Sequence, residues 1–328
     1  MMHIETKFDL VNSWLKENAD RVPFCQSFEW EEILSRESKN IERLVVLDGD
    51  IPVVMALVEY HRLPFGWQYA FCPKGPVATK SLNVERRKLA MDCLGEYLKE
   101  KNCIFFRVEP LLDILGAKKA LDFNPRATFV LDLRKTPDDL LAGMHQKTRY
   151  NINLSQKKDL RVSDAKDADI FMALMKETAK RDGFRLHETR HYHEIIFSPL
   201  SQQLTVYYGP KAIATAVFAG FGDTFTYVFG ASDYDHRSLM APYLIQWEGI
   251  KMGQRYGFRY YDFFGVAPKA TGRTDGLEYN PKHQYAGVTR FKQGFGGEYC
   301  EEPGTFDLIL SPGKYKLYGL LRRLRRLF

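Results

Sequence analysis

The sequence predicts an α/β protein made of two similar units in tandem. The first observation is the order of the expected elements: strand, turn, strand, strand, helix and strand follow one another in the N-terminal half and again in the C-terminal half. The second is the length, because 328 residues exceed one average domain. The third is the composition: 45% hydrophobic and 14% aromatic residues are enough to fill two cores.

The first half begins with strands at about 43–48 and 51–61, joined by the turn Asp48-Gly49-Asp50. A third strand at 67–72 precedes a helix over about 83–101, and a strand at 103–108 follows. The helix is expected to bury one stripe of side chains, namely Leu89, Cys93, Tyr97 and Leu98.

The second half repeats this order with strands at 204–209, 212–221 and 224–230, a helix over 242–256 and a strand at 258–266. Two tandem N-acetyltransferase-like (GNAT-like) domains would show this arrangement. The repeat is one of pattern and not of residues.

Two helices are expected between the halves. The first begins at Thr136, which is followed by a proline and two acids, and continues through Leu140, Leu141, Met144 and the segment KTRYNI. The second covers about 166–181 and ends before Gly183. It should bury Phe171, Leu174, Met175 and Thr178. Neither segment sustains the heptads of a long coiled-coil arm.

Composition limits the possible locations and functions. No apolar run approaches the ~20 residues that span a bilayer, and the polar N-terminus does not resemble a secretory signal. Five scattered cysteines without a CxxC pair argue against a disulfide framework and against a zinc ribbon, so a cytoplasmic location is expected. The formal charge of +6 lies entirely in residues 314–328, since removing their six basic residues leaves 41 basic against 41 acidic.

Two segments could carry chemistry. In Arg290-Phe291-Lys292-Gln293-Gly294-Phe295-Gly296-Gly297, the glycines allow close approach to a ligand, and an ammonium could stabilise an oxyanion. A glycine-rich hairpin with a solvated Lys292 is equally compatible with these residues. The second segment contains Lys147, Arg149 and Tyr150, which could clamp phosphates and stack on a base or sugar. A merely solvated helix face is the alternative.

Several strings together resemble the Fem family of peptidoglycan interpeptide-bridge aminoacyltransferases. They occur in the family's order from about Gln26-Ser27 to Tyr318: Pro73-Lys74-Gly75-Pro76, Arg107-Val108-Glu109-Pro110, LLAGMHQKTRYNINLSQKKDLRV, Tyr261-Asp262-Phe263-Phe264-Gly265, and RFKQGFGG with a closing YKLYGLL helix. The resemblance implies two GNAT-like domains, 1–130 and 131–305, with a C-terminal helix at 306–328 that rejoins the first. It also implies transfer of an amino acid from aminoacyl-tRNA to a stem-peptide amine of UDP-MurNAc-pentapeptide or lipid II, without a cofactor or metal.

The resemblance also assigns roles to residues. Lys292 would stabilise the tetrahedral intermediate, the carbonyl of Phe291 would orient the amine, and Glu109 would accept a proton. Tyr243 would contact the precursor, and Arg181 or Arg185 its phosphates. A lysine that some members carry shortly after the Q-S-x-x-W motif has no counterpart here.

The residues leave other functions open. An acyl-CoA-dependent N-acyltransferase would have the same fold, but the segment Ser232–Pro242 lacks the glycines of a pyrophosphate loop. A non-catalytic binding protein on the same scaffold is a further alternative. A zinc peptidase is suggested by His187-Glu188-Thr189-Arg190-His191, which matches HExxH, although Thr189 is expected to cap a helix and leave His187 in a loop.

The C-terminal helix has three interpretations. Its stripe of Leu317, Leu320, Leu321, Leu324 and Phe328 could pack on the first domain. A basic amphipathic helix could instead lie on the inner face of the plasma membrane as a peripheral contact. Contact with tRNA phosphates is the third possibility.

Overall fold

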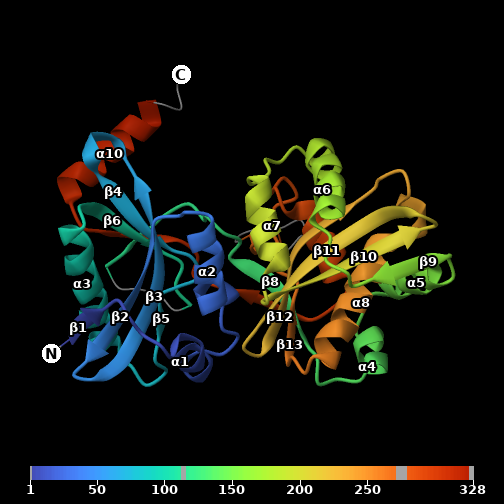
Figure 1. The fold of residues 1–328 in the computed structure, drawn as a ribbon, viewed down its shortest axis with the longest axis horizontal. Helices are drawn as coiled ribbons and strands as arrows, with labels where there is room; N and C mark the ends of the chain where they lie inside the picture. The colour runs from blue at the N-terminus through green and yellow to red at the C-terminus, as the bar shows by residue number, and fades with distance from the viewer. Residues whose placement is uncertain (1, 112–115, 271–278, 325–328) are drawn as a thin grey trace. The chain divides into compact units, whose positions relative to one another are not determined.

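The computed structural model describes residues 2–111, 116–270 and 279–324, and it folds into two compact units (Figure 1). The first comprises Met1–Asn124 and Glu302–Phe328, and the second Pro125–Glu301. These boundaries differ by a few residues from the expected 130/131 and 305/306, because strand β8 (Ala127–Asp132) pairs within the second sheet. None of the helices in the described ranges is both long and apolar enough to cross a membrane.

The first unit contains a mixed sheet in the order β1-β2-β3-β4-β6-β15-β7, with β5 paired to β3. Neighbouring strands are antiparallel except β4 and β6, which are parallel. The strands are β1 (Met2–Glu5), β2 (Ile41–Asp48), β3 (Ile51–Arg62), β4 (Gln68–Cys72), β5 (Val77–Ala78), β6 (Cys103–Val108), β7 (Lys118–Lys119) and β15 (Phe306–Ile309).

Helix α3 (Val84–Glu100) covers one face of this sheet, and α1 (Val11–Asn18) and α2 (Phe28–Arg36) lie against the other (Figure 1). The expected buried stripe of α3 was wrong at Leu89, which is exposed. The helix buries Ala90, Leu94 and Gly95 instead, and a Cβ on Gly95 would lie 3.1 Å from Leu310. Small residues therefore face the sheet because the helix packs closely on it.

The chain returns to the first unit through a strand and not directly through a helix. Residues 306–309 form β15, and helix α10 (Pro312–Leu324) begins only after it, so the expected helix over 306–328 starts too early. Strand β15 pairs with β6, where Asp307 accepts two hydrogen bonds from the buried Arg107 guanidinium at 2.8 and 2.9 Å. Residues 325–328, including Phe328, lie outside the described residues.

The second unit contains a mixed sheet in the order β14-β8-β13-β12-β11-β10-β9, with β12 and β13 parallel and the other pairs antiparallel. The remaining strands are β9 (Leu160–Ser163), β10 (Ser201–Tyr208), β11 (Lys211–Phe221), β12 (Thr224–Ser232), β13 (Tyr260–Asp262) and β14 (Glu298–Glu301).

Helices cover both faces of this second sheet. Helices α6 (Ala168–Asp182) and α7 (Thr189–Phe197) lie on one face, and α8 (Ala241–Arg255) lies on the other (Figure 1). The expected inward residues of α6 are all buried, and Gly183 ends the helix at φ 73°. The longest helix in the described part of the chain is α3 with 17 residues, so the expectation of a compact form without a long helical arm is confirmed there.

The helix expected from Thr136 onward is divided into α4 (Pro137–Ala142) and α5 (Gln146–Gln156). Thr136 caps α4 as expected, by accepting from the Asp139 amide. The interruption at 143–145 has a tertiary cause, because the His145 amide donates to the Gly294 carbonyl at 2.9 Å. A segment distant in sequence thus takes the backbone group that a continuous helix would use.

Candidate functional site

The segment RFKQGFGG is not a hairpin. Its first four residues complete helix α9 (Ala286–Gln293), and the glycines follow the helix. Gly296 and Gly297 have φ of 78° and 92°, and a Cβ on them would lie 2.6 Å from the Gly143 carbonyl oxygen and 2.7 Å from that of Val130. The glycines therefore let the chain after α9 pack against the α4–α5 loop and β8, which places α9 firmly in the unit.

Lys292 is buried and is not a solvated cation. Its side chain is only 5% exposed, and Nζ donates to the carbonyl oxygens of Phe264 at 2.8 Å and Gly265 at 2.9 Å. Burial lowers the pKa of Lys292 to about 7, and the neighbouring charge of Asp262 acts in the opposite direction. The ammonium is thus held in a fixed position by backbone acceptors and can lose its proton near neutral pH.

The turn after β13 explains how two carbonyls converge on one ammonium. Phe264 has φ 54°, a left-handed conformation that is rare for a bulky residue. Asp262 holds this turn, since its Oδ1 accepts from the Phe264 amide at 2.7 Å and also from the Thr128 hydroxyl. In the string Tyr261-Asp262-Phe263-Phe264-Gly265 the aspartate therefore shapes the backbone, which in turn positions Lys292.

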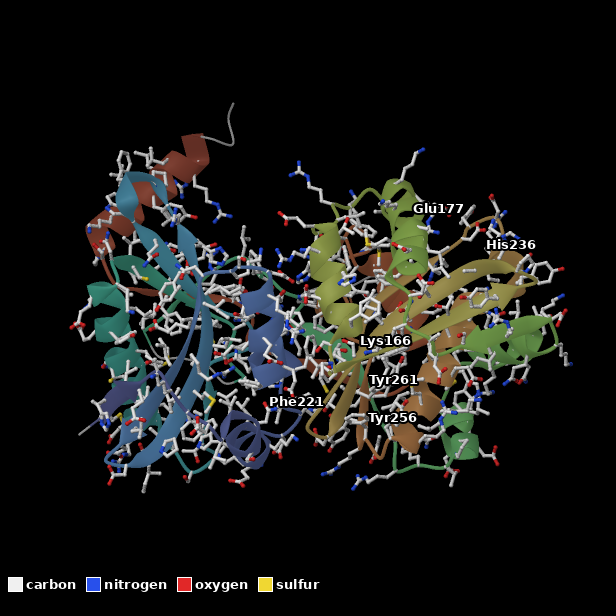
Figure 2. All side chains as sticks on the ribbon, in the orientation of Figure 1. Lys166, Glu177, Phe221, His236, Tyr256 and Tyr261 are labelled. Atoms are coloured by element: carbon white, nitrogen blue, oxygen red, sulfur yellow. The ribbon has the colours of Figure 1, made fainter. Side chains whose placement is uncertain are left out.

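A pocket of about 190 Å³ lies in the same unit, where β12 ends and α8 begins. Figure 2 shows His236 near this end of the sheet. The lining residues come from α6, β11, the β12–α8 connection, α8 and α9; they are Arg181, Ile213, Ser232, Asp233, Tyr234, His236, Arg237, Met240, Ala241, Pro242, Tyr243 and Phe291. The pocket thus brings together three residues that the sequence singled out: Arg181, Tyr243 and Phe291.

Aromatic rings link the pocket wall to helix α9. The Tyr243 and Phe291 rings meet edge to face with centroids 5.1 Å apart, and Phe295 packs against both at 5.8 and 5.3 Å. Phe291 lies in the last turn of α9, where backbone carbonyls lack partners within the helix. Lys292, one residue further, faces the interior and is not a lining residue of this pocket.

The pocket has a positive wall. The guanidinium carbons of Arg181 and Arg237 lie 5.7 and 4.3 Å from the centroid of the Tyr234 ring. Arg181 is also paired with Asp182 at 2.7 Å. The N-terminus of α8 adds the partial positive charge of a helix dipole. The acid in the wall, Asp233, is already paired with Lys211 at 2.7 Å and His236 at 2.8 Å. The hydrogen bond from Lys211 is the main cause that lowers the pKa of Asp233 to about 2.

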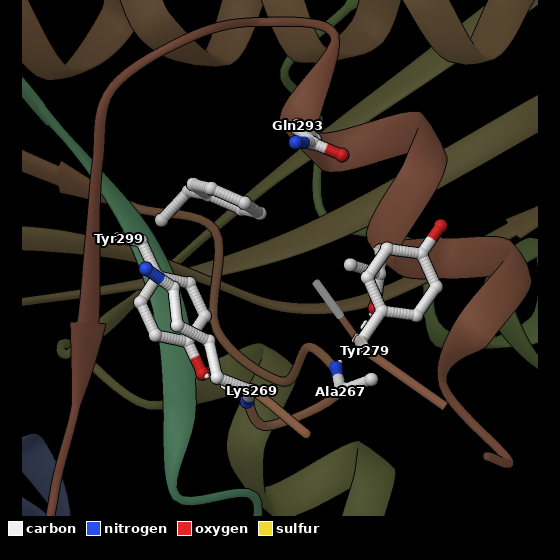
Figure 3. A pocket seen from close by; sticks show the side chains of 7 residues that line it. Ala267, Lys269, Tyr279, Gln293 and Tyr299 are labelled. Atoms are coloured by element: carbon white, nitrogen blue, oxygen red, sulfur yellow. Dashed lines mark hydrogen bonds between the residues drawn. The ribbon is translucent and has the colours of Figure 1, made fainter. Parts of the chain in front are cut away.

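A second, much smaller hollow of about 10 Å³ lies beside α9 (Figure 3). Thr289 and Gln293, one helical turn apart, line it together with Ala267, Lys269, Tyr279, Tyr299 and Phe129. Such a volume is about that of one water-sized probe, so it cannot admit a substrate. The larger pocket is therefore the candidate functional site.

In the predicted phosphate clamp on α5, Arg149 has a structural contact, and its phosphate contact stays a prediction. Its guanidinium donates to the carbonyls of Leu141, Ala142 and Met144, so it caps the C-terminal turn of α4. Lys147 and Tyr150 are exposed on α5 but do not line the pocket, and Arg185 is exposed in the loop after α6. For these three residues, substrate contact stays a prediction.

Glu109 lies in the first unit, whereas Lys292 lies in the second. Its buried carboxylate accepts hydrogen bonds from the Lys74 and Asn124 amides, the Asn124 side chain and the Thr305 hydroxyl, at 2.7–3.2 Å. The two carboxylate oxygens thus hold together the loop at Lys74 and the segments at Asn124 and Thr305, where the chain leaves and re-enters this unit. The geometry favours a structural role for Glu109 over that of a proton acceptor.

The HExxH string does not lie within one helix. His187 precedes α7, Glu188 is the residue before the first helical turn, and His191 lies inside the helix. The expected cap at Thr189 is therefore displaced by one residue. In the part of the chain that the structure describes, no group of three His, Cys, Asp or Glu side chains is placed to hold a metal ion.

Sequence reasoning missed Tyr234 and Arg237 as pocket residues. By its sequence, the segment Ser232–Pro242 stands out only in lacking the glycines of a pyrophosphate loop. An arginine near an aromatic residue, shortly before a helix with proline in its first turn, is the signal that could have identified an anion-binding wall.

The perturbed lysine predicts an unusual dependence of stability on pH. Between about pH 7 and the unperturbed value of 10.5, the unfolded chain binds one proton more at position 292 than the folded chain. The unfolding free energy should therefore rise with pH in this window, by up to about 1.4 kcal/mol per pH unit, relative to Lys292→Met. Urea denaturation at pH 7, 8 and 9 measures this difference. Equal slopes for both proteins would show that Lys292 titrates normally. Lys251→Met, at a partly exposed lysine of α8, serves as the matched control.

Two mixed sheets flanked by helices, each with a parallel strand pair at its centre, define a tandem GNAT-like protein. A crystal structure of FemX superposes with a TM-score of 0.77 at 18% identity, over 94% of this chain and 97% of that one. A tandem GNAT protein from the clavulanic acid biosynthesis pathway superposes with a TM-score of 0.52 at 12% identity, over 92% and 93%. The predicted fold is thereby confirmed.

The chain belongs to the FemAB family, whose model matches residues 10–120, 115–198 and 200–323. Lipid II:glycine glycyltransferase of Staphylococcus epidermidis is 22% identical over 62% of this chain. The match spans only 63% of the length of that relative. Aminoacyltransferase FemA of the same species is 20% identical over 79% of this chain and 84% of its own, and the Staphylococcus aureus glycyltransferase is 21% identical over 89% of each. The resemblance drawn from the sequence motifs is confirmed.

Proposed function

We propose that this protein is an aminoacyltransferase of cell-wall synthesis that uses aminoacyl-tRNA as donor. Its acceptor is an amine of a peptidoglycan stem peptide, on UDP-MurNAc-pentapeptide or on lipid II. The observation that carries the proposal is the buried Lys292, whose ammonium is held by the Phe264 and Gly265 carbonyls. Lys292 is next in sequence to Phe291, which lines the pocket. Family membership and the names of the relatives supply the substrate class.

The donor ester needs no further activation, which fits a site without an evident nucleophile. The acceptor amine attacks the ester carbonyl carbon and loses a proton to water. The C–O bond to the tRNA ribose then breaks, the ribose oxygen takes a proton from water and leaves as the hydroxyl, and the amide forms. The positive charge of the buried Lys292 ammonium, next in sequence to the lining residue Phe291, stabilises the oxyanion between these events. Positioning the amine, the role assigned to the carbonyl of the lining residue Phe291, supplies much of the remaining acceleration.

The positive wall suits the diphosphate that both acceptors carry. Arg237 offers planar donors for phosphate oxygens, and Arg181, which is paired with Asp182 in this structure, adds a second guanidinium. The α8 N-terminus adds the partial positive charge of its dipole. Tyr243 lines the same pocket and contacts the Phe291 ring, so a ligand in the pocket could reach both. An acyl-CoA also carries a diphosphate, so a CoA arm belongs in the test.

A transfer assay tests the proposal directly. The protein is incubated with a pool of charged tRNAs and either UDP-MurNAc-pentapeptide or lipid II, and the acceptor is analysed by mass spectrometry. We expect a mass gain of one amino-acid residue, absent with deacylated tRNA. No gain on either acceptor, with acylation of an amine from acetyl-CoA, would reject the proposal in favour of an ordinary N-acyltransferase. Binding without any turnover would identify a non-catalytic protein.

A further inference from the structure

Helix α10 carries apolar side chains on two faces. Tyr315 and Tyr318 face the first unit, where their rings pack against Phe105 with centroids 5.3 and 5.6 Å away. Leu317 and Leu320 are instead 43% and 55% exposed. The interpretation that the Leu317–Leu320 stripe packs on the first domain is therefore wrong for these two residues, since the tyrosines occupy the contact with β6.

The tip of the β3–β4 hairpin lies beside this helix (Figure 1). The Lys314 ammonium is 5.7 Å from the centroid of the Trp67 ring, which links the helix to the hairpin. At the tip, Phe65 is 71% exposed and has φ 62° and ψ 26°. A bulky side chain in this conformation is unfavourable, and asparagine or glycine would fit better. A strained aromatic residue that packs on no core suggests a role outside the fold.

The charges around these apolar residues are all of one sign along the helix. Residues 312–324 contain Lys314, Lys316, Arg322 and Arg323, each exposed, and no acid. We call Phe65, Leu317 and Leu320 together with these four cations the hairpin–helix surface. It combines exposed apolar side chains with several cations, which is the pattern of proteins that bind to a bilayer interface.

We propose that the hairpin–helix surface docks the protein onto the headgroup region of an anionic lipid bilayer. The apolar side chains enter the boundary between headgroups and acyl chains, and the cations neutralise lipid phosphates. Nucleic-acid phosphates would satisfy the cations, but they would leave Phe65, Leu317 and Leu320 exposed to water. Membrane docking would hold the enzyme at a lipid-linked acceptor, and only this benefit rests on the proposed function.

Sedimentation of the full chain with vesicles tests the proposal without any turnover. We expect binding to vesicles of phosphatidylglycerol and phosphatidylcholine, much weaker binding to phosphatidylcholine alone, and loss of binding in high salt. A variant with Phe65→Asn, Leu317→Ser and Leu320→Ser should bind the vesicles with an affinity at least about tenfold lower. Asparagine is chosen because it tolerates positive φ, so this variant should fold as the natural chain does. Unchanged binding of this variant would overturn the proposal.

A second variant separates charge from insertion. Lys316→Gln with Arg322→Gln and Arg323→Gln should weaken binding to anionic vesicles by on the order of 100-fold.

Ile51→Ser is the matched control for the apolar variant, because Ile51 is 68% exposed at the opposite end of β3 and should not affect vesicle binding. If the charge variant lost tRNA binding while vesicle binding persisted, the surface would be a tRNA contact. Transfer to the soluble acceptor should stay unchanged in both variants, so failure here is distinct from failure of the proposed function.

Discussion

Replacing Lys292 by alanine is expected to lower the transfer rate by about 10²–10³-fold, the usual loss when one preorganised donor to an oxyanion is removed. The ammonium sits in a buried site, where electrostatic stabilisation is stronger than in water. Single-turnover transfer to UDP-MurNAc-pentapeptide measures the effect. Acceptor affinity should change little, because Lys292 does not line the pocket.

The control for this substitution must distinguish chemistry from folding. Lys251→Ala removes a partly exposed lysine of α8, paired with Glu248 on the same helix, and should keep full activity. Lys292→Ala should bind the acceptor as the natural chain does. Its unfolding temperature should shift only modestly, because the substitution removes a buried charge together with the ammonium's hydrogen bonds. A Lys292→Ala protein that folds, binds acceptor and transfers at the natural rate would exclude Lys292 from the reaction.

Replacing Asp307 by alanine is expected to lower the unfolding free energy of the first unit by about 3–5 kcal/mol, because it leaves the buried Arg107 charge without its partner. Asp307 accepts a bidentate pair from Arg107 and a third hydrogen bond from the Tyr315 hydroxyl at 2.8 Å. It thereby joins β6, β15 and α10. Three of the four tryptophans lie in this unit, so urea denaturation followed by fluorescence reports on it.

Two further variants make this prediction specific. Arg107→Met combined with Asp307→Leu should recover most of the loss, since an apolar pair of similar volume is often as stable as a buried ion pair. Asp20→Ala breaks the exposed pair with Lys80 and should cost less than about 1 kcal/mol. If Asp307→Ala were as mild as Asp20→Ala, the buried pair would not be what holds β15 in the first unit.

The local sequence was sufficient for elements whose signals lie within a few residues. Thr136 and Gly183 delimit helices because capping depends on neighbouring backbone groups, and α6 buries its predicted stripe because its apolar residues recur at helical spacing. The same logic misjudged Leu89 in α3, since the sheet and not the helix decides which of two adjacent stripes faces inward.

The sequence by itself determined the fold class, the family and the segments that contain the site, because ordered motifs and periodicities are properties of the chain alone. Only the tertiary structure decided the state of Lys292, since its pKa depends on burial and on carbonyls 27 and 28 residues away. It likewise decided that Arg149 caps α4 while Arg237 lines a pocket, although both are arginines near an aromatic residue. What a charged side chain does depends on which distant groups surround it, and those are brought together only by packing.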